Sequence, residues 1–444
     1  MTLDLDRRQV SNLVDWQNGL VDRRIFFEQD IYELELEQIF ARAWLFMCHD
    51  SQIPNPGDFF MTFMGEDRVI VVRDNEGLPQ VLINSCRHRG NAVCRAEEGH
   101  ATSFMCTYHG WTYDLKGNLV GVPGFKEVYH EELDRENWGL IRAAQVDTYK
   151  GFIFANMDAE AVSLPEYLGE VGRMSIAFIA ERGDRIKAVP GIQKYIIPCN
   201  WKLAVDNVWD YYHGLTHSSA TLSGWPPSRT GAPRRQIGSF RDGGGAQICL
   251  LGEYGHAFGG PILKEDGTGA EATFETGWRN RPEAQSALGP VGIKFSSGHP
   301  NIFPNMWITQ ASQVCLRMPK GPNSTEIWWW SILDADLDEP TFKAQKHRDG
   351  HHFGPAGIFE QDDGENWGES TKGARGVISM RFPLNYQMGM GHEVISDEAS
   401  PPRIESGTNE HPQLWHYRAW ADWMGAESWA DLKANHSQVP RDRM

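Results

Sequence analysis

The stretch that decides the fold is Cys86-Arg87-His88, followed after seventeen intervening residues by Cys106-Thr107-Tyr108-His109. The first segment has the pattern C-x-H and the second C-x2-H, so each supplies one thiol and one imidazole. Gly90 and Gly110 follow the two segments where a tight backbone turn would be needed. This pattern predicts two finger-like loops that hold one metal centre between them.

Four ligands of this kind could bind a tetrahedral zinc ion, but zinc fingers normally pair Cys with Cys and His with His. Mixed pairs favour a [2Fe-2S] cluster in which one iron takes both Cys and the other takes both His, which is the Rieske arrangement. Neutral imidazoles make the cluster less negative and raise its potential, so it can act as a one-electron relay. We therefore assign Cys86, His88, Cys106 and His109 as cluster ligands and keep a zinc site as the alternative.

The composition of the chain narrows its class. It has 444 residues, with 59 Asp and Glu against 42 Lys and Arg, and a net charge of −17. Phosphate binding needs a surplus of basic residues, so the charge argues against a nucleic-acid or anionic-membrane partner. No apolar run approaches the roughly 18 residues of a membrane helix. The odd number of seven thinly spread cysteines fits a reducing compartment, so we expect a cytoplasmic enzyme of two or three domains.

A small β-rich domain is predicted around the fingers, over residues 43–160. Val69-Ile70-Val71-Val72 and Val81-Leu82-Ile83 flank a turn-prone segment and read as paired strands. A second hairpin is expected between Tyr113 and Leu119, and a buried strand at Gly151-Phe152-Ile153-Phe154-Ala155. The whole chain is thus expected to have an α+β fold that begins with a Rieske-type β domain.

The other parts of the chain are expected to be more helical. Residues 1–42 form an N-terminal segment, with an amphipathic helix over 28–44, that packs on the catalytic domain. Residues 161–444 form a larger catalytic domain in which helices flank an antiparallel sheet, whereas 223–300 reads as loops because it is rich in Gly, Pro and Ser. The expected helices are 164–182, 200–217, 357–373 and 411–433, and the expected strands are 194–198, 305–318 and 325–333.

A second group of candidate ligands lies after Asn200-Trp201-Lys202. Asn207, Asp210, His213 and His217 are three, three and four residues apart, which would place all four on one stripe of a helix. Two His at positions i and i+4 can bind one ion. With an acidic third ligand they would form the 2-His-1-carboxylate triad of non-haem Fe(II) oxygenases, which leaves open positions on the metal.

The third ligand is expected in the acidic segment 353–367. The sequence alone leaves four candidates for this ligand: Glu360, Asp362, Asp363 and Glu365. The same acidic run would also suit the solvent-facing side of an ordinary helix.

The sequence resembles the α (large) subunit of the Rieske non-haem iron aromatic ring-hydroxylating dioxygenases, most closely the biphenyl, toluene and naphthalene branch. The resemblance covers nearly the whole chain. It rests on five motifs: Phe40-Ala41-Arg42-Ala43-Trp44, Cys86-Arg87-His88-Arg89-Gly90, Cys106-Thr107-Tyr108-His109-Gly110-Trp111, Asn200-Trp201-Lys202 and Glu360-Gln361-Asp362-Asp363-Gly364-Glu365-Asn366-Trp367.

The resemblance implies a role for each candidate ligand. It makes His213, His217 and Asp363 the ligands of the mononuclear Fe(II). Asp210 matches the carboxylate that links an iron-ligand His to the cluster-ligand His, here His109, of the adjacent subunit. Asn207 matches a polar residue beside the iron. One departure is that this branch usually has more than three residues between its two iron His.

The resemblance also implies an activity and partners. The chain would be the terminal oxygenase that adds both atoms of O2 to an aromatic ring, giving a cis-dihydrodiol. Electrons would come from NADH through a reductase and a ferredoxin, because the chain shows no convincing dinucleotide fingerprint. The assembly would be a head-to-tail α3 trimer, often capped by small β subunits as α3β3. The alternatives are a Rieske mono-oxygenase or demethylase and, more distantly, a pure electron-transfer Rieske protein.

The substrate is the property that the sequence indicates least clearly. Val208, Leu215, Phe353 and Phe359 lie next to the predicted iron-binding elements and could line an apolar pocket, or they could be ordinary core. An aromatic hydrocarbon fits such a lining. An aromatic carboxylate would need an Arg or Lys facing the ring, and the sequence places neither Arg241 nor Lys264 there.

Overall fold

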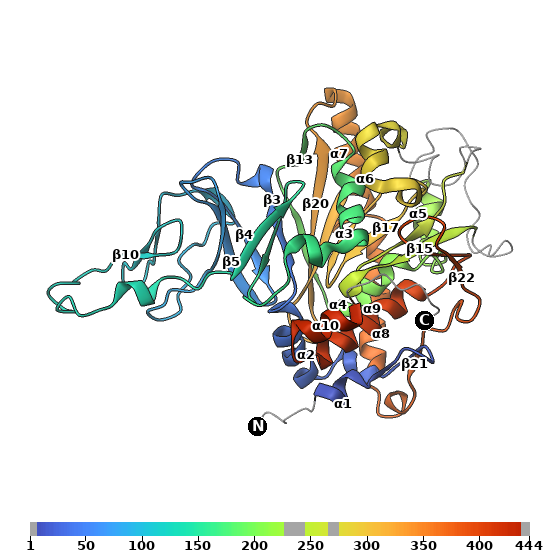
Figure 1. The fold of residues 1–444 in the computed structure, drawn as a ribbon, viewed down its shortest axis with the longest axis horizontal. Helices are drawn as coiled ribbons and strands as arrows, with labels where there is room; N and C mark the ends of the chain where they lie inside the picture. The colour runs from blue at the N-terminus through green and yellow to red at the C-terminus, as the bar shows by residue number, and fades with distance from the viewer. Residues whose placement is uncertain (1–6, 226–244, 265–274, 437–444) are drawn as a thin grey trace. The chain divides into compact units, whose positions relative to one another are not determined.

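The computed structural model describes residues 7–225, 245–264 and 275–436. The chain divides into two compact units, one over Phe40–Leu164 and the other formed by Met1–Ile39 with Pro165–Met444 (Figure 1). Within the described residues, no helix is long and apolar enough to cross a membrane. The α+β class expected from the sequence is confirmed.

The smaller unit is rich in β-strands, as the sequence predicts, and its strands form three antiparallel sheets. One sheet has the order β6-β5-β4-β7, a second β10-β9-β8 and a third β11-β12-β3. The strands are β3 (Leu45–His49), β4 (Asp58–Met64), β5 (Asp67–Arg73), β6 (Pro79–Ile83), β7 (Glu98–His100), β8 (Phe104–Met105), β9 (Thr112–Tyr113), β10 (Leu119–Gly121), β11 (Gln145–Tyr149) and β12 (Phe152–Asn156).

The predicted hairpins of this unit are confirmed. Strands β5 and β6 pair in antiparallel fashion, and the carboxylate of Asp74 accepts the N–H groups of Glu76 and Leu78 in the turn between them. Tyr113 pairs with Leu119 in the second hairpin. Cys86, Cys106 and Trp111 belong to the buried apolar core of this unit, so the fingers rest directly on packed side chains.

A ten-stranded antiparallel sheet forms the centre of the larger unit. Its order is β13-β20-β19-β18-β17-β16-β15-β23-β22, and β14 also pairs with β20. The strands are β13 (Ile186–Ala188), β14 (Gln193–Ile197), β15 (Gln247–Leu251), β16 (Ala257–Pro261), β17 (His299–Ile302), β18 (Met306–Ile308), β19 (Gln313–Pro319), β20 (Thr325–Asp334), β22 (Val394–Ser396) and β23 (Arg403–Ser406). A separate small sheet has the order β1-β2-β21 and joins β1 (Val14–Asp15), β2 (Leu20–Val21) and β21 (Leu384–Asn385).

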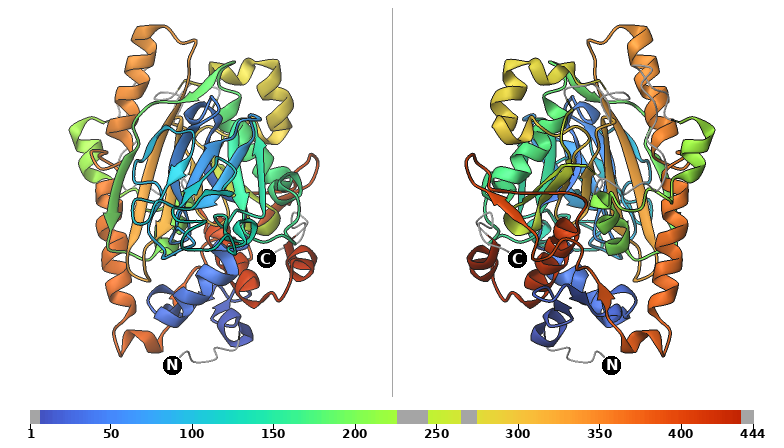
Figure 2. Two further views of the ribbon diagram at one scale, coloured as in Figure 1. Left: turned by 90° about the vertical axis from the view of Figure 1, so that its left-hand side faces the viewer. Right: turned by 90° about the vertical axis from the view of Figure 1, so that its right-hand side faces the viewer.

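Helices flank this sheet on both sides. Figure 2 shows α7 and α8 along one flank and α3 and α6 along the other. The described helices of the larger unit are α1 (Arg7–Ser11), α2 (Gln29–Glu35), α3 (Leu164–Ala180), α4 (Trp201–Asp206), α5 (Ser218–Ser223), α6 (Pro282–Gly292), α7 (Glu339–His352), α8 (Glu360–Ala374), α9 (His411–Gly425) and α10 (Trp429–His436). Helix α7 was not expected from the sequence, whereas α3, α8 and α9 were.

The helix predicted over 200–217 is wrong beyond its first half. Helix α4 ends at Asp206, and a short 3-10 turn covers Asn207–Trp209. The carboxylate of Asp210 then accepts the N–H groups of Tyr212 and His213, at 2.8 and 3.2 Å. A side chain that binds nearby backbone N–H groups competes with helical hydrogen bonds, so the candidate ligands lie on a loop and not on a helical stripe.

Two further expectations need correction. The described part of 223–300 is not only loop, because it contains β15, β16, α6 and the start of β17, and the two strands lie inside the large sheet. The expected N-terminal helix over 28–44 is α2 followed by a π-helical turn over Leu36–Phe40. Strand β15 was missed because its apolar run, Ile248-Cys249-Leu250-Leu251, is short, lies beside Gly-rich sequence and carries no clear period.

Candidate metal centres

The two fingers of the smaller unit have nearly the same backbone. The N–H of Gly90 donates to the carbonyl of Cys86 at 2.8 Å, and the N–H of Gly110 donates to that of Cys106 at 2.9 Å. Both glycines have a positive φ, of 74° and 76°, which only glycine adopts without strain. Each finger is therefore a tight turn that its own sequence specifies.

The four candidate cluster ligands lie together at the finger tips. Both thiols are buried, whereas the imidazoles of His88 and His109 are partly exposed and their ring centres are 4.4 Å apart. The ring of His88 stacks on Trp111, with centres 5.1 Å apart. An arrangement with buried sulfur and partly exposed imidazole suits a cluster whose His side faces an electron-transfer partner.

Hydrogen-bond donors surround the two sulfur atoms. The Tyr113 hydroxyl lies 3.3 Å from the Sγ of Cys86, and the Asn91 amide nitrogen lies 3.6 Å from the Sγ of Cys106. Burial raises the pKa of the Cys106 thiol, but hydrogen bonds from the backbone of Tyr108 and from Asn91 outweigh burial and hold it below its usual value. Because the thiolate is the form that binds metal, these donors favour cluster binding.

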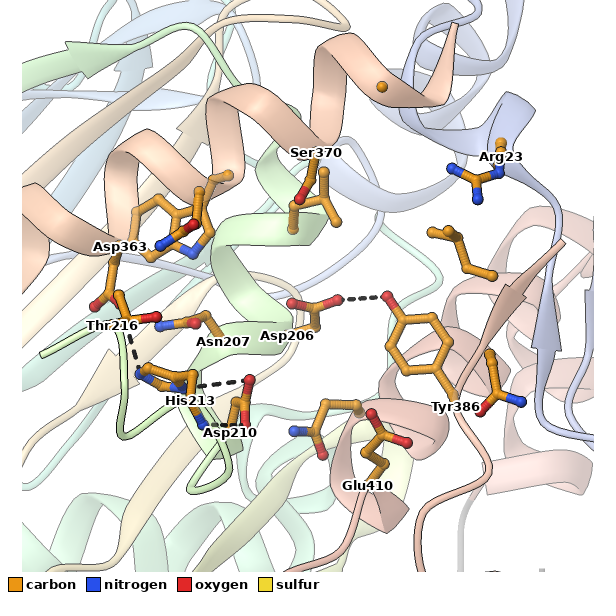
Figure 3. A pocket seen from close by; sticks show the side chains of 17 residues that line it. Arg23, Asp206, Asn207, Asp210, His213, Thr216, Asp363, Ser370, Tyr386 and Glu410 are labelled. Carbon is orange, nitrogen blue, oxygen red and sulfur yellow. Dashed lines mark hydrogen bonds and ion pairs between the residues drawn. The ribbon is translucent and has the colours of Figure 1, made fainter. Parts of the chain in front are cut away.

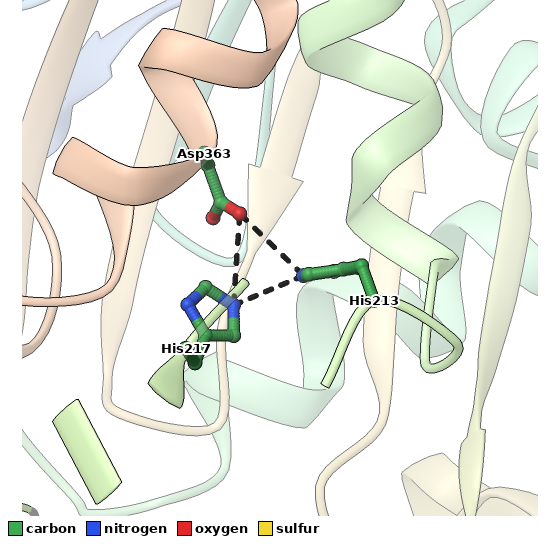
Figure 4. Close-up of side chains that lie close together, drawn as sticks. All are labelled: His213, His217 and Asp363. Atoms are coloured by element: carbon green, nitrogen blue, oxygen red, sulfur yellow. Dashed lines mark hydrogen bonds and ion pairs between the residues drawn. The ribbon is translucent and has the colours of Figure 1, made fainter. Parts of the chain in front are cut away.

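The second group of ligands converges in the larger unit (Figure 4). The Nε2 atoms of His213 and His217 are 3.0 Å apart, and the Oδ1 of Asp363 lies 3.5 Å from the first and 3.6 Å from the second. Ligand atoms at about 2.1 Å from one ion are separated by about 3.0 to 3.4 Å, so one metal ion fits between these three. Among the described residues, this is the one group of three or more His, Cys, Asp or Glu side chains whose ligand atoms all lie within 4.8 Å of one another.

The pKa values of these side chains are also compatible with the binding of a metal cation. Burial raises the pKa of Asp363 to about 7 and, with the neighbouring His213, lowers that of His217 to about 3. The Oδ1 of Asp363 is buried and has no hydrogen-bond partner among the described residues. Two imidazoles and one carboxylate, with other positions left open, are the ligand set of non-haem Fe(II).

Different elements bring the three ligands together. Helix α8 begins at Glu360 with three acidic residues in its first turn, where the helix dipole favours negative charge, and Asp363 is the one whose side chain points to the two His. The backbone N–H of Asn200, at the start of α4, donates to the hydroxyl of Thr371 on α8 at 2.9 Å. The loop that carries the His therefore starts from a helix that is tied directly to α8.

Asp210 lies directly behind one of the imidazoles. Its Oδ2 is 3.2 Å from the Nδ1 of His213, on the opposite side of the ring from the triad. Burial disfavours charge on both groups, yet their mutual interaction outweighs it, raising the pKa of His213 and lowering that of Asp210. This contact orients the imidazole and leaves its Nε2 for the metal.

A pocket of about 450 Å³ adjoins these groups (Figure 3). Asp210, His213 and Asp363 line it, together with Asn207. Its far side has a buried carboxylate, Asp206, that accepts hydrogen bonds from the hydroxyls of two tyrosines, Tyr417 at 2.5 Å and Tyr386 at 2.8 Å. No motif in the sequence indicates the tyrosine pair, which comes from segments far along the chain.

The candidate substrate residues are not all in one place. Phe353 and Phe359 are near each other and near the triad, with the Phe359 ring 4.7 Å from that of His217. Val208 is buried, and its carbonyl lies 2.7 Å from the Nδ1 of His299. Leu215, by contrast, is 65% exposed. Of the two basic candidates, Lys264 is exposed and Arg241 lies outside the described residues.

A buried carboxylate in the N-terminal segment was also missed. Glu35 accepts hydrogen bonds from Lys202 at 2.5 Å, Trp420 at 2.7 Å and Trp201 at 2.8 Å. Both members of the Glu35–Lys202 ion pair are completely buried. The Trp and Lys of the Asn200-Trp201-Lys202 motif thus fix α4 to α2, which gives that motif a structural role.

Comparison with known proteins agrees with both centres. The family model described as "Rieske [2Fe-2S] domain" matches residues 43–145, and "Ring hydroxylating alpha subunit (catalytic domain)" matches residues 173–426. The fold and the two sites thus define a Rieske-type oxygenase component.

Individual relatives narrow the class. The chain is 37% identical to the chlorobenzene dioxygenase subunit alpha of Cupriavidus sp. (strain PS12), with 96% of each chain covered. It is 38% identical to the biphenyl 2,3-dioxygenase subunit alpha of Rhodococcus jostii (strain RHA1), covering 97% of this chain and 94% of the relative. A structure of naphthalene 1,2-dioxygenase with indole bound matches with a TM-score of 0.83 and 29% identity, over 96% of each chain.

The chain therefore belongs to the Rieske-type aromatic ring-hydroxylating dioxygenases, as an alpha (large) subunit. It is an oxidoreductase whose cofactors are a Rieske [2Fe-2S] cluster and a mononuclear iron.

Proposed function

We propose that this chain is the terminal oxygenase subunit that adds both atoms of O2 to an aromatic ring and releases a cis-dihydrodiol. The observation that carries the proposal is the convergence of His213, His217 and Asp363 on one point, with Asp210 behind the first imidazole. The relatives named for chlorobenzene and biphenyl support an aromatic substrate.

The ligands of both cofactors follow from the side chains that lie together. Cys86 and Cys106 would hold one iron of the cluster, and His88 and His109 the other. His213, His217 and Asp363 would hold the mononuclear iron. When bound, the cluster supplies single electrons and the mononuclear iron supplies the open positions at which O2 is activated.

The residues around the iron site would control orientation and proton position. Asp210 keeps the Nδ1 of His213 engaged, so the Nε2 faces the metal. Phe359 packs against His217, where it would restrict access of water from that side. Asn207 lines the pocket beside the triad, where its amide could orient a polar group.

We further propose that the functional unit is a cyclic α3 trimer, with or without small β subunits as α3β3. In such an assembly His109 of one subunit would meet Asp210 of the next, and an electron would pass through these two groups to His213. Two features support this. Asp210 lines a pocket at the surface of the larger unit, and the side chains beside His109 on the finger, Met105 and Tyr108, are 58% and 59% exposed.

Electrons would reach the cluster from NADH through a separate reductase and a ferredoxin. The sequence contains no convincing dinucleotide-binding fingerprint, so we propose that the reducing power comes from other proteins. The partly exposed imidazoles of the cluster site are where a small electron carrier would dock.

The decisive test is turnover of an aromatic substrate under 18O2 with a surrogate ferredoxin and reductase. Mass spectrometry should find a cis-diol that carries two labelled oxygen atoms. A product with one labelled atom would indicate the mono-oxygenase alternative. Electron uptake without any oxygenated product would indicate a pure electron-transfer protein.

The trimer is tested separately by analytical ultracentrifugation combined with turnover. We expect the active species to contain three copies of this chain. A fully active monomer would refute the proposed path through His109 and Asp210, while leaving the reaction class intact.

A further inference from the structure

One buried cation near the iron site has no assigned task. Arg317 lies on strand β19 and is only 1% exposed. Its guanidinium donates no hydrogen bond to any described residue, and its Nε and Nη1 are buried without a partner in this part of the chain. No carboxylate of the described residues lies within 4 Å of it, so the nearest acids do not form an ion pair with it.

Two other arginines of the same unit, the half-buried Arg182 and the buried Arg279, have hydrogen-bond acceptors within the chain. The guanidinium of Arg182 donates to three backbone carbonyls and to the hydroxyl of Ser312. Arg279 donates to the carbonyls of Phe295 and Ser296. Because a buried charge without partners is costly, the bare guanidinium of Arg317 calls for an acceptor that the described protein does not provide.

Arg317 contacts two aromatic rings near the iron site. Its guanidinium carbon lies 4.5 Å from the ring centre of Trp307 and 5.6 Å from that of Trp367. Trp367 follows Asp363 by four residues on α8, and side chains at that spacing are neighbours, about 5 to 6 Å apart. Through Trp367 the cation is in contact with the helix that carries the proposed iron ligand.

A second chain of contacts reaches the triad from the other side. Trp307 packs against Phe353, with ring centres 4.9 Å apart, and Phe353 lies 6.2 Å from Phe359. Phe359 in turn contacts His217. An aromatic wall therefore runs from Arg317 to the iron ligands, as a site for a ring with one charged end would require.

The acids near the iron site do not pair with Arg317. One carboxylate oxygen of the buried Glu360 already accepts the N–H of Gly354 at 3.1 Å. Asp363 faces the two imidazoles, and Asp210 lies 3.2 Å from the Nδ1 of His213. The carboxylate of a substrate would give Arg317 the direct partner that these acids do not.

We propose that Arg317 binds the carboxylate of an aromatic acid, so the substrate class of this enzyme is an aromatic carboxylate. The inference rests on the proposed oxygenase function and adds the polar end of the substrate to it. The planar guanidinium would donate two parallel hydrogen bonds to a carboxylate, in the bidentate geometry that this pair favours. The aromatic ring of the acid would then lie along the Trp307 and Phe353 side of the site.

The test uses the purified holoenzyme and two matched substrate pairs, benzoate with benzamide and naphthalene-2-carboxylate with naphthalene. Affinity is measured without electrons by equilibrium dialysis, and products are measured with a surrogate ferredoxin and reductase. We expect each acid to bind about a hundredfold more tightly than its neutral partner, because a buried charge pair is worth that much.

Variants separate this binding role from a structural one. Arg317→Met should abolish the preference for acids while leaving benzamide and naphthalene within a few-fold of wild type, and Arg317→Lys should keep part of it. Arg279→Met is the matched control, since Arg279 is also buried on a Trp ring but donates to backbone carbonyls, and it should keep the full preference. If Arg317→Met does not fold, the comparison of acid with amide in wild type and in Arg317→Lys still decides the question.

Three results would overturn the inference. Neutral rings that are bound and dihydroxylated as well as the acids would refute it while leaving the proposed function standing. An acid preference that survives Arg317→Met would assign the anion site elsewhere. If none of the four compounds binds or is oxygenated, the proposed function and the inference fail together.

Discussion

The two metal centres of this chain are built in opposite ways. The cluster site takes its ligands from two fingers only seventeen residues apart, each closed by its own glycine turn. The iron site joins a loop at His213 to a helix at Asp363, some 150 residues later, and depends on buried side chains from other parts of the unit. A local site can be read from a motif, whereas a site assembled over long range depends on the packing of the whole unit.

The largest effect is expected from a variant that loses the mononuclear iron and keeps the cluster. Asp363→Ala removes the only carboxylate of the triad, so we expect the mononuclear iron to be lost and turnover to fall by a factor of at least about a thousand. The Rieske signal in electron paramagnetic resonance should be unchanged, because no finger residue is altered. Metal analysis together with that spectrum checks the result.

The matched control for that variant is Asp362→Ala, the adjacent acid of the same helix. The carboxylate of Asp362 accepts a hydrogen bond from Ser219 at 2.6 Å, and its side chain is not part of the triad. It should retain the iron. Equal loss of iron from both variants would contradict the assignment of Asp363.

A substitution at Glu35, which is not an iron ligand, tests whether the iron site depends on distant packing. Glu35→Gln leaves Lys202 as an uncompensated buried charge, and breaking such a pair costs about 3–5 kcal/mol. We expect the midpoint of urea unfolding of the larger unit to fall and the affinity for Fe(II) to fall with it, since α4 starts the loop of His213. The cluster should be retained.

The control for the Glu35 variant is an exposed ion pair on the iron-site helix itself. Glu369 pairs with Lys372 on α8, and both side chains are largely exposed. Glu369→Gln should leave the unfolding midpoint and the Fe(II) affinity unchanged. If Glu35→Gln behaves in the same way, α2 is not part of the support of the iron site.

The buried acid of the pocket gives the larger unit a specific pH dependence. Burial raises the pKa of Asp206 to about 7 from an ordinary 3.8, against the hydrogen bonds of Tyr417 and Tyr386 and with the help of the nearby charges of Asp210 and Glu410. A carboxyl group with a raised pKa stabilises the fold below pH 3.8, and that contribution is lost as the pH rises to about 7.

Asp206→Asn should remove this dependence. We expect wild type and variant to have similar stability near pH 4, and the variant to be more stable above pH 7 by up to about 3–4 kcal/mol. Urea unfolding at several pH values measures the difference between the two. A difference that does not change with pH would mean that Asp206 is ionised throughout the range.

The difference between a local site and a long-range site also explains how much of each centre could be predicted from the sequence. Both hairpins and the two glycine turns are consequences of short segments, and the sequence predicted them. The four finger side chains proposed as cluster ligands also come from short segments, and their assignment stays a prediction. The loop at Asp210 was predicted as helix, because Asn207, Asp210, His213 and His217 have helical spacing. That spacing says nothing of a carboxylate that binds the N–H groups of the next residues.

Residues that act through tertiary contacts left no motif at all. Glu35 sits in an ordinary acidic helix, and only the folded unit shows that three donors surround it. Arg317 is one of many arginines in the sequence, and only its burial and its lack of acceptors single it out. Asp363 was chosen from four acids by family resemblance, and the structure shows geometrically why it stands apart.

The smallest expected effect tests whether the two fingers are truly local and independent. Replacing either turn glycine with Ala places a side chain in the left-handed region, at a cost of about 1–2 kcal/mol. The two positions differ in their surroundings. A Cβ on Gly90 would have the Ser85 Oγ as its nearest neighbour, at 3.8 Å, whereas a Cβ on Gly110 would lie 2.8 Å from the Cγ of Pro123. We therefore expect Gly110→Ala to lower the thermal stability of the cluster signal more than Gly90→Ala, by about a further 1 kcal/mol.

Melting followed by cluster absorbance measures both, and neither variant should change the Fe(II) affinity of the other centre. Equal losses would show that the Pro123 ring moves aside, and a loss of mononuclear iron in either variant would show that the two centres are not built independently.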